Sequence, residues 1–92
     1  MNIQITRSTS PKARPPEAEL GFGRHFSDHL FVMDYTTEKG WFDARIAPYG
    51  AFSIDPAAGV FHYGQAMFEG SNAFRGDDKK IRLFRPKAHA AR

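Results

Sequence analysis

The chain has 92 residues, fewer than the roughly 100–150 of a typical domain, so we expect one small domain or part of one. With 41% hydrophobic and 25% charged residues, its composition excludes a disordered tail and a collagen-like fibre and predicts a modest core. It has no cysteine, no apolar run near the roughly 20 residues that span a bilayer and no apolar secretory signal. These absences predict a cytoplasmic protein without disulfides or a cysteine-based zinc site.

The first 19 residues are predicted to form an extended arm. Ile3 and Ile5 alternate with polar residues, which is enough for a short edge strand. Residues 7–18 contain three prolines and little to bury, a pattern typical of polyproline conformation. We place a small α+β domain at residues 20–92, after this arm.

A hairpin is predicted over the next part of the chain. The apolar run from Leu30 to Met33 is short, partly aromatic and closed by polar residues that end at Gly40, which favours a strand over a helix. A second extended stretch follows from Gly40 to Ile46, and the Pro48-Tyr49-Gly50 run ends it.

A helix is predicted from Asp55 to about Gly70. Asp55-Pro56 is a favourable start, because it offers an N-cap acceptor followed by proline at the first helical position. Gly70 stands where a glycine would end the helix. Apolar residues recur between these limits near the helical period of 3.6: Val60, Tyr63, Met67 and Phe68.

Residues 72–85 contain the clearest hairpin signal of the chain. Phe74 on one side and Ile81 and Leu83 on the other alternate with polar residues around a Gly-Asp-Asp turn. Pro86 begins a second helix, within which the chain ends. The order of strands, helix, hairpin and helix predicts an α+β fold, and the short final helix suggests that the chain is part of a longer protein.

The net charge of +3 arises at the C-terminal side of the chain. Residues 79–92 carry six basic groups and no acidic one. Such a cluster suits nucleic acid, an anionic membrane surface or a phosphate-bearing small molecule, and equally a solvated face.

Metal and nucleotide motifs are weak. His25, Asp28 and His29 resemble a ligand set, but on a strand His25 and Asp28 would point to opposite faces, and no second cluster is present. The Gly21-Phe22-Gly23 run lacks the third glycine of a dinucleotide loop and the flanking residues of an RNA-binding segment. We therefore predict no metal site and no dinucleotide site.

Catalytic patterns are also absent from the residues taken alone. No serine lies in a Gly-x-Ser-x-Gly elbow, and no pair of acidic residues has a spacing that fixes two carboxylates on one face. Tyr63 and Phe68 could border a cavity at the end of the predicted helix, but such aromatics more often belong to a core.

Several collinear motifs resemble those of branched-chain amino acid aminotransferases, pyridoxal-phosphate enzymes of fold type IV. The likeness covers most of residues 20–92. It is carried by FHYGQAMFEGSNAFR at 61–75 and IRLFRP at 81–86, and by GFG at 21–23, FSDH at 26–29, DY at 34–35, GW at 40–41, RIAPY at 45–49 and DPA at 55–57.

The resemblance implies roles for four residues. Arg92 falls where the family places an arginine that binds the phosphate of pyridoxal 5'-phosphate, a task suited to a planar, always charged donor. Tyr63 and Phe68 look like residues of the substrate pocket, and Phe26 like a third. An aromatic wall suits the side chains of leucine, isoleucine and valine, for which each methylene contributes roughly 1–3 kcal/mol of discrimination.

The implied reaction is ping-pong transfer of the amino group from a branched-chain amino acid to 2-oxoglutarate, in a homodimer. The Schiff-base lysine of the family lies beyond this chain, so we expect no catalytic residue here and no activity from the chain alone. Two departures from the family pattern, Ser71-Asn72 and Ala88-His89, concern local packing and the geometry of the phosphate site.

Two alternatives stay open. A small basic module could bind nucleic acid through residues 79–92, with an affinity that falls steeply with salt. A structural or dimer-forming piece without a ligand is the third interpretation.

Overall fold

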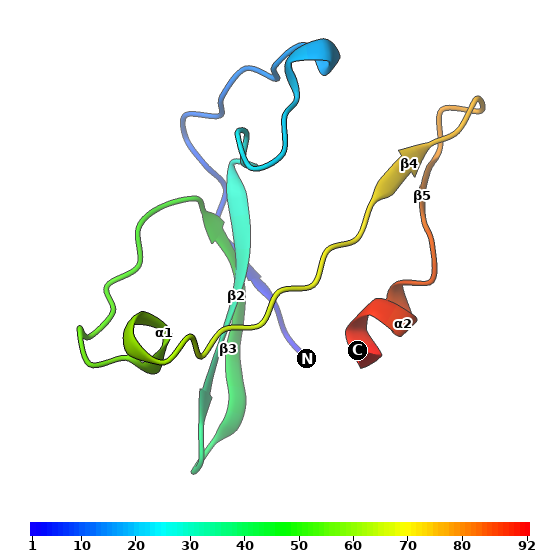
Figure 1. The fold of residues 1–92 in the computed structure, drawn as a ribbon. Helices are drawn as coiled ribbons and strands as arrows, with labels where there is room; N and C mark the ends of the chain where they lie inside the picture. The colour runs from blue at the N-terminus through cyan, green and yellow to red at the C-terminus, as the bar shows by residue number, and fades with distance from the viewer. The chain divides into compact units, whose positions relative to one another are not determined.

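The computed structural model describes all 92 residues and divides them into two units, Met1–Phe52 and Ser53–Arg92. The elements, in chain order, are β1 (Gln4–Ile5), a 3₁₀ helix η1 (Glu17–Glu19), β2 (His29–Thr36), β3 (Gly40–Pro48), α1 (Gly59–His62), β4 (Ala73–Arg75), β5 (Ile81–Leu83) and α2 (Pro86–Ala91) (Figure 1). This order confirms the predicted α+β class. The boundary proposed between an arm of 1–19 and a domain of 20–92 stays a prediction.

The first unit is built on a three-stranded sheet of order β1-β3-β2. β2 and β3 are the predicted hairpin, antiparallel from the His29–Pro48 pair to the Thr36–Gly40 pair. Ile5 pairs in parallel with Ile46, so the predicted edge strand is also confirmed. Alternating apolar residues and a glycine after the turn thus gave the correct strands, because both signals are local.

A bulge interrupts the hairpin at Asp43. Val32 pairs with Arg45 and Asp34 with Phe42, so Asp43 and Ala44 together lie opposite one residue of β2. Asp43 has a positive φ of 53°. The Arg45 guanidinium reaches across it, with Nη1 2.8 Å from Asp34 Oδ2 and 2.7 Å from Asp43 Oδ2. The hydrogen bond from Arg45 to Asp34 raises the pKa of Arg45 and stabilises the irregular register.

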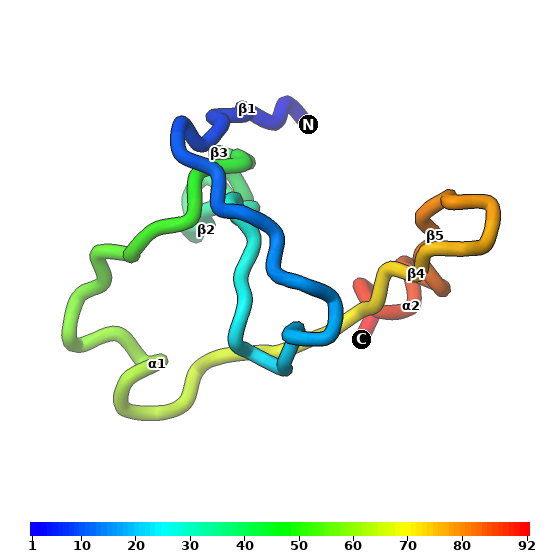
Figure 2. The backbone as a smooth tube through the Cα atoms, turned by 90° about the horizontal axis from the view of Figure 1, so that it is seen from above, coloured from blue at the N-terminus to red at the C-terminus, as the bar shows by residue number.

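The N-terminal arm is tied to the chain that leads into β2. The backbone N–H of Ser8 donates to His29 Nε2 at 2.8 Å, and that of Lys12 donates to Asp28 Oδ1 at 3.1 Å. Figure 2 shows the arm, in blue, beside this part of the chain, in cyan. Within the arm, Glu17–Glu19 form a 3₁₀ turn that the sequence did not predict.

The helix predicted from Asp55 to Gly70 is wrong. α1 has only four residues, and Asp55 stabilises a turn instead, with Oδ1 accepting from Ala57 N at 2.8 Å. Gly64, with φ of 59°, lies just beyond the helix end. An internal glycine costs about 1 kcal/mol, and a helix this short is marginal without a surface to pack on. Met67 and Phe68 are correspondingly 90% and 82% exposed.

The remaining elements of the second unit agree with the sequence. β4 and β5 pair antiparallel, with Ala73 opposite Leu83 and Arg75 opposite Ile81. α2 begins at Pro86, as expected from the fixed φ of proline. Neither helix of the structure is long and apolar enough to cross a membrane.

The predicted modest core is wrong. Ala44, 6% exposed, is the one buried apolar residue. The sheets of the two units are narrow ribbons, and most of their large apolar side chains lie exposed.

Candidate functional site

The candidate site is an open hollow of about 450 Å³ in the second unit. It forms where the segment before β4 meets α2, because the β4–β5 hairpin folds the chain back on itself. The residues that line it are Met67, Phe68, Glu69, His89, Ala90 and Arg92. It therefore combines apolar side chains with one carboxylate, one imidazole and one guanidinium.

Glu69 is the centre of the polar contacts. One carboxylate oxygen, Oε1, lies 2.8 Å from His89 Nδ1, and the other, Oε2, lies 3.3 Å from Arg92 Nε. The side chains of His89 and Glu69 are 27% and 32% exposed, whereas that of Arg92 is 67% exposed. From a segment without regular secondary structure, the carboxylate thus bridges His89 of α2 and Arg92, which follows α2.

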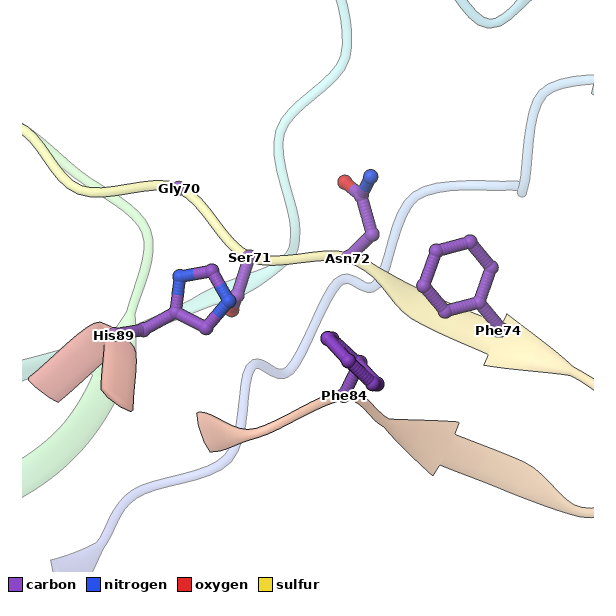
Figure 3. Close-up of a pocket in the computed structure, with 6 residues that line it drawn as sticks. All are labelled: Gly70, Ser71, Asn72, Phe74, Phe84 and His89. Atoms are coloured by element: carbon purple, nitrogen blue, oxygen red, sulfur yellow. The ribbon is translucent and has the colours of Figure 1, made fainter. Parts of the chain in front are cut away.

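A second, smaller hollow of about 200 Å³ lies beside the first and shares His89 with it. Figure 3 shows the imidazole reaching from α2 toward Ser71, with the rings of Phe74 and Phe84 farther along the hairpin. Asn72 lines the same hollow. The two departures from the family pattern, Ser71-Asn72 and His89, therefore lie together in space.

The structure brings together two of the four predicted site residues. Arg92 and Phe68 line the same hollow, on the side where Arg92 contacts Glu69. Tyr63 is not among its lining residues; it is 83% exposed, and its ring meets His62 edge-on with 6.4 Å between centroids. Tyr63 and Phe68 are separated because the predicted long helix does not form, and only a continuous helix would have fixed the distance between these two residues.

Phe26 belongs to the first unit. It stacks on Tyr49 with 5.6 Å between ring centroids and is 57% exposed. It lines a hollow of about 390 Å³ together with Lys12, Arg14 and His25 of that unit. Phe26 therefore has an aromatic partner and cationic neighbours of its own.

The residues of the weak metal motif do not lie as the sequence suggested. β2 begins at His29, so His25 and Asp28 both precede the strand, and the argument from opposite strand faces does not apply to them. Asp28 instead accepts a hydrogen bond from Lys12 N, and His29 accepts one from Ser8 N. No three histidine or acidic side chains of the 92 residues come together in a way that could hold a metal ion.

Glu69 and His89 were missed as site residues. Spacing along one element does not reveal Glu69, because its partners His89 and Arg92 lie 20 or more positions away. The hairpin supplies the signal: since Ala73 pairs with Leu83, residues shortly before β4 and shortly after β5 are brought near one another. Extending this register places Glu69 close to the start of α2.

Part of the basic cluster at 79–92 is neutralised within the chain. Arg82 forms a two-point contact with Asp78, with distances of 2.8 Å and 2.7 Å, and Arg92 contacts Glu69. These pairs reduce the charge available to a polyanion.

Comparison with known proteins identifies the family. No family model matches the chain. It is 48% identical to branched-chain-amino-acid aminotransferase 2 of Bacillus subtilis and 51% identical to branched-chain-amino-acid transaminase 1 of the same organism, each over 90 residues. These matches cover 98% of this chain and 25% of each relative. A branched-chain-amino-acid aminotransferase of Mycolicibacterium smegmatis is 49% identical over 75 residues, which are 82% of this chain and 20% of the relative.

The chain thus spans about a quarter of the length of these relatives, as expected for part of such an enzyme. The likeness extends into the first 19 residues, beyond the part to which the motifs had assigned it. The relatives give no support to a nucleic-acid-binding module. By its sequence, the chain belongs to the branched-chain aminotransferase family.

Proposed function

We propose that the chain supplies Arg92 as a phosphate-binding residue, and part of the substrate pocket, to a pyridoxal-phosphate-dependent branched-chain aminotransferase. The enzyme would transfer the amino group of leucine, isoleucine or valine to 2-oxoglutarate and yield glutamate in the second half of a ping-pong cycle. The observation that carries the proposal is the shared hollow of Arg92 and Phe68, in a chain about half identical to enzymes of that name.

The donor chemistry of Arg92 fits a phosphate. A guanidinium has five N–H donors in a planar fork, and Arg92 directs only its Nε toward Glu69. The four donors on its terminal nitrogens have no partner in the chain, so they suit two-point binding of phosphate oxygens. When bound, pyridoxal phosphate supplies a ring that takes up the electron pair released from the amino acid.

The apolar side of the hollow suits a branched aliphatic side chain. Phe68 and Met67 stand next to each other in sequence and both line the hollow. Burial of a leucine or valine side chain against such residues favours binding by roughly 25 cal/mol for each Å² removed from water. Tyr63 and Phe26 remain proposed pocket residues by resemblance.

The chain alone is proposed to be inactive, because none of its lysines stands in the family position that carries the cofactor. We also propose that the whole enzyme is a cytoplasmic homodimer.

A chimera tests the function of the whole enzyme. The 90 matched residues of the Bacillus subtilis transaminase 1 would be replaced by the corresponding part of this chain, and leucine-dependent formation of glutamate would be measured. We expect an active chimera, and we expect Arg92→Met in it to weaken pyridoxal-phosphate binding by at least about tenfold, the loss of a charge-assisted contact. Arg75→Met, which removes a β4 arginine without an ion pair, is the matched control.

An inactive chimera that folds and dimerises like the parent would refute the proposed contribution to catalysis. Transamination by the unmodified 92-residue chain would refute the claim that it needs residues from elsewhere.

A further inference from the structure

We infer that Glu69 is a positioning residue, which holds the guanidinium of Arg92 so that its terminal nitrogens can bind a phosphate. This role rests on the proposed function of Arg92 as the phosphate ligand. The two carboxylate oxygens have separate partners, His89 Nδ1 at 2.8 Å and Arg92 Nε at 3.3 Å. The Nε–Oε2 contact is an ion pair, which holds the Nε edge of the guanidinium toward Glu69 and leaves the terminal nitrogens available.

His89 in turn holds Glu69. The half-buried residues of the second unit are few, and His89 is the only one among them with an ionisable side chain. Its imidazole lies between the two hollows, where it lines both. The Glu69 carboxylate is therefore anchored at one oxygen by a side chain that is itself restrained.

Nothing else in the chain performs this task. α2 has six residues and buries none of them, and a helix of that length is marginal on its own. Segment 64–72 has no regular secondary structure. The contacts of Glu69 are the only side-chain hydrogen bonds or ion pairs between that segment and α2. Without Glu69, only the β4–β5 hairpin would hold the two sides of the hollow near each other.

The negative charge of Glu69, considered alone, predicts that removing this residue tightens phosphate binding, whereas an orienting role predicts that it weakens binding. The inference is therefore testable. A carboxylate beside a phosphate repels it, so removing Glu69 should tighten anion binding if the residue acts only as a counterion. Removing Glu69 should weaken binding if its contribution is to orient Arg92. The sign of the change separates the two roles.

The experiment uses the chimera with the Bacillus subtilis transaminase 1 described above, in which this chain stands in a complete enzyme, with Glu69→Ala and Glu69→Gln. Binding of pyridoxal phosphate is followed by phosphorus NMR, and the Nε–H signal of Arg92 is followed by nitrogen-15 NMR without any ligand. Glutamine keeps the length of the side chain but removes the charge, so both variants lose the ion pair with Arg92. We expect each variant to weaken binding about five- to tenfold, whereas the removal of a simple counterion would tighten binding.

The Arg92 signal should move to the position of an exposed arginine in both variants. Glu38→Ala, which removes an exposed carboxylate without an ion pair in the first unit, is the control and should change neither measurement. Amide exchange of β4 and β5 verifies that the hairpin persists. If Glu69→Ala loses the hairpin, Glu69→Asp takes its place, because it keeps the charge but is too short to reach both partners.

Binding by Glu69→Ala as tight as that of the unmodified chimera, or tighter, would overturn the inference, as would an unchanged Arg92 signal. An unmodified chimera that binds no pyridoxal phosphate, although Glu69→Ala displaces the Arg92 signal, would count against the proposed function while supporting the orienting role of Glu69. The two failures are therefore distinguishable.

Discussion

Each of the two units of the chain is stabilised internally by different interactions. In the first, β2 and β3 pair over most of their length, and the ladder contains nearly all of the half-buried residues of the sheet as well as Ala44. In the second, β4 and β5 form only three pairs. The half-buried residues of the second unit are Ala58, Gly59, Gly76 and His89.

The difference shows what the candidate site depends on. Backbone pairing specifies the first unit through many weak contacts, so no single polar side chain decides its geometry. The hollow of the second unit depends on a few polar contacts around Glu69, which one substitution can remove. Regions with little burial open at low free-energy cost, which is common where ligands bind.

The largest expected effect comes from placing a charge at the buried position of the first unit. Ala44→Asp would bury a carboxylate without a partner, at a cost of about 3 kcal/mol or more. We expect amides of β2 and β3 to lose protection from hydrogen exchange, while those of β4 and β5 keep theirs. Ala51→Asp, at an exposed position after β3, is the control and should leave both hairpins unchanged.

Equal loss of protection in both hairpins of Ala44→Asp would contradict the separation of the chain into two units.

Local backbone pairing could be predicted from the sequence, whereas contacts that join distant residues could not. Both hairpins were predicted correctly, because alternation and turn residues act over a few positions. The helix over 55–70 was not, since periodic apolar residues such as Met67 indicate a helix only if a surface covers them, and Gly64 opposes it. The family motifs singled out Arg92 and Phe68. They did not reveal the contact of Glu69 with His89, which joins residues 20 positions apart across a hairpin.

A smaller effect is expected at the turn of the β4–β5 hairpin. Lys79 has a φ of 61°, a conformation that costs a residue with a Cβ roughly 1 kcal/mol relative to glycine. Lys79→Gly should therefore stabilise the hairpin by about 0.5–1 kcal/mol, seen as a several-fold slower amide exchange in β4 and β5.

Lys80→Gly is the matched control, because Lys80 is not among the residues with positive φ and a glycine there only adds flexibility. It should destabilise the same hairpin. Equal effects of the two substitutions would show that charge, which both remove, outweighs backbone conformation at this turn.

The smallest effect concerns pH and the second hairpin alone. The hydrogen bonds from Arg82 to Asp78 lower the pKa of that carboxyl below its ordinary value of 3.8. A lowered pKa means that the unfolded hairpin takes up a proton more readily, so the contribution of the pair is complete above the ordinary value and lost as the pH falls through the lowered one.

Acidification from pH 5 toward about pH 2 should accordingly increase amide exchange in β4 and β5, after correction for the intrinsic rate, by a modest factor because the pair is exposed. Asp78→Asn should remove this pH dependence and lower stability at pH 5. Amide exchange of β2 and β3 in the same titration is the internal comparison, because these strands belong to the other unit. If β2 and β3 lose protection over the same range as β4 and β5, acid acts on the chain as a whole, and the independence of the two units fails.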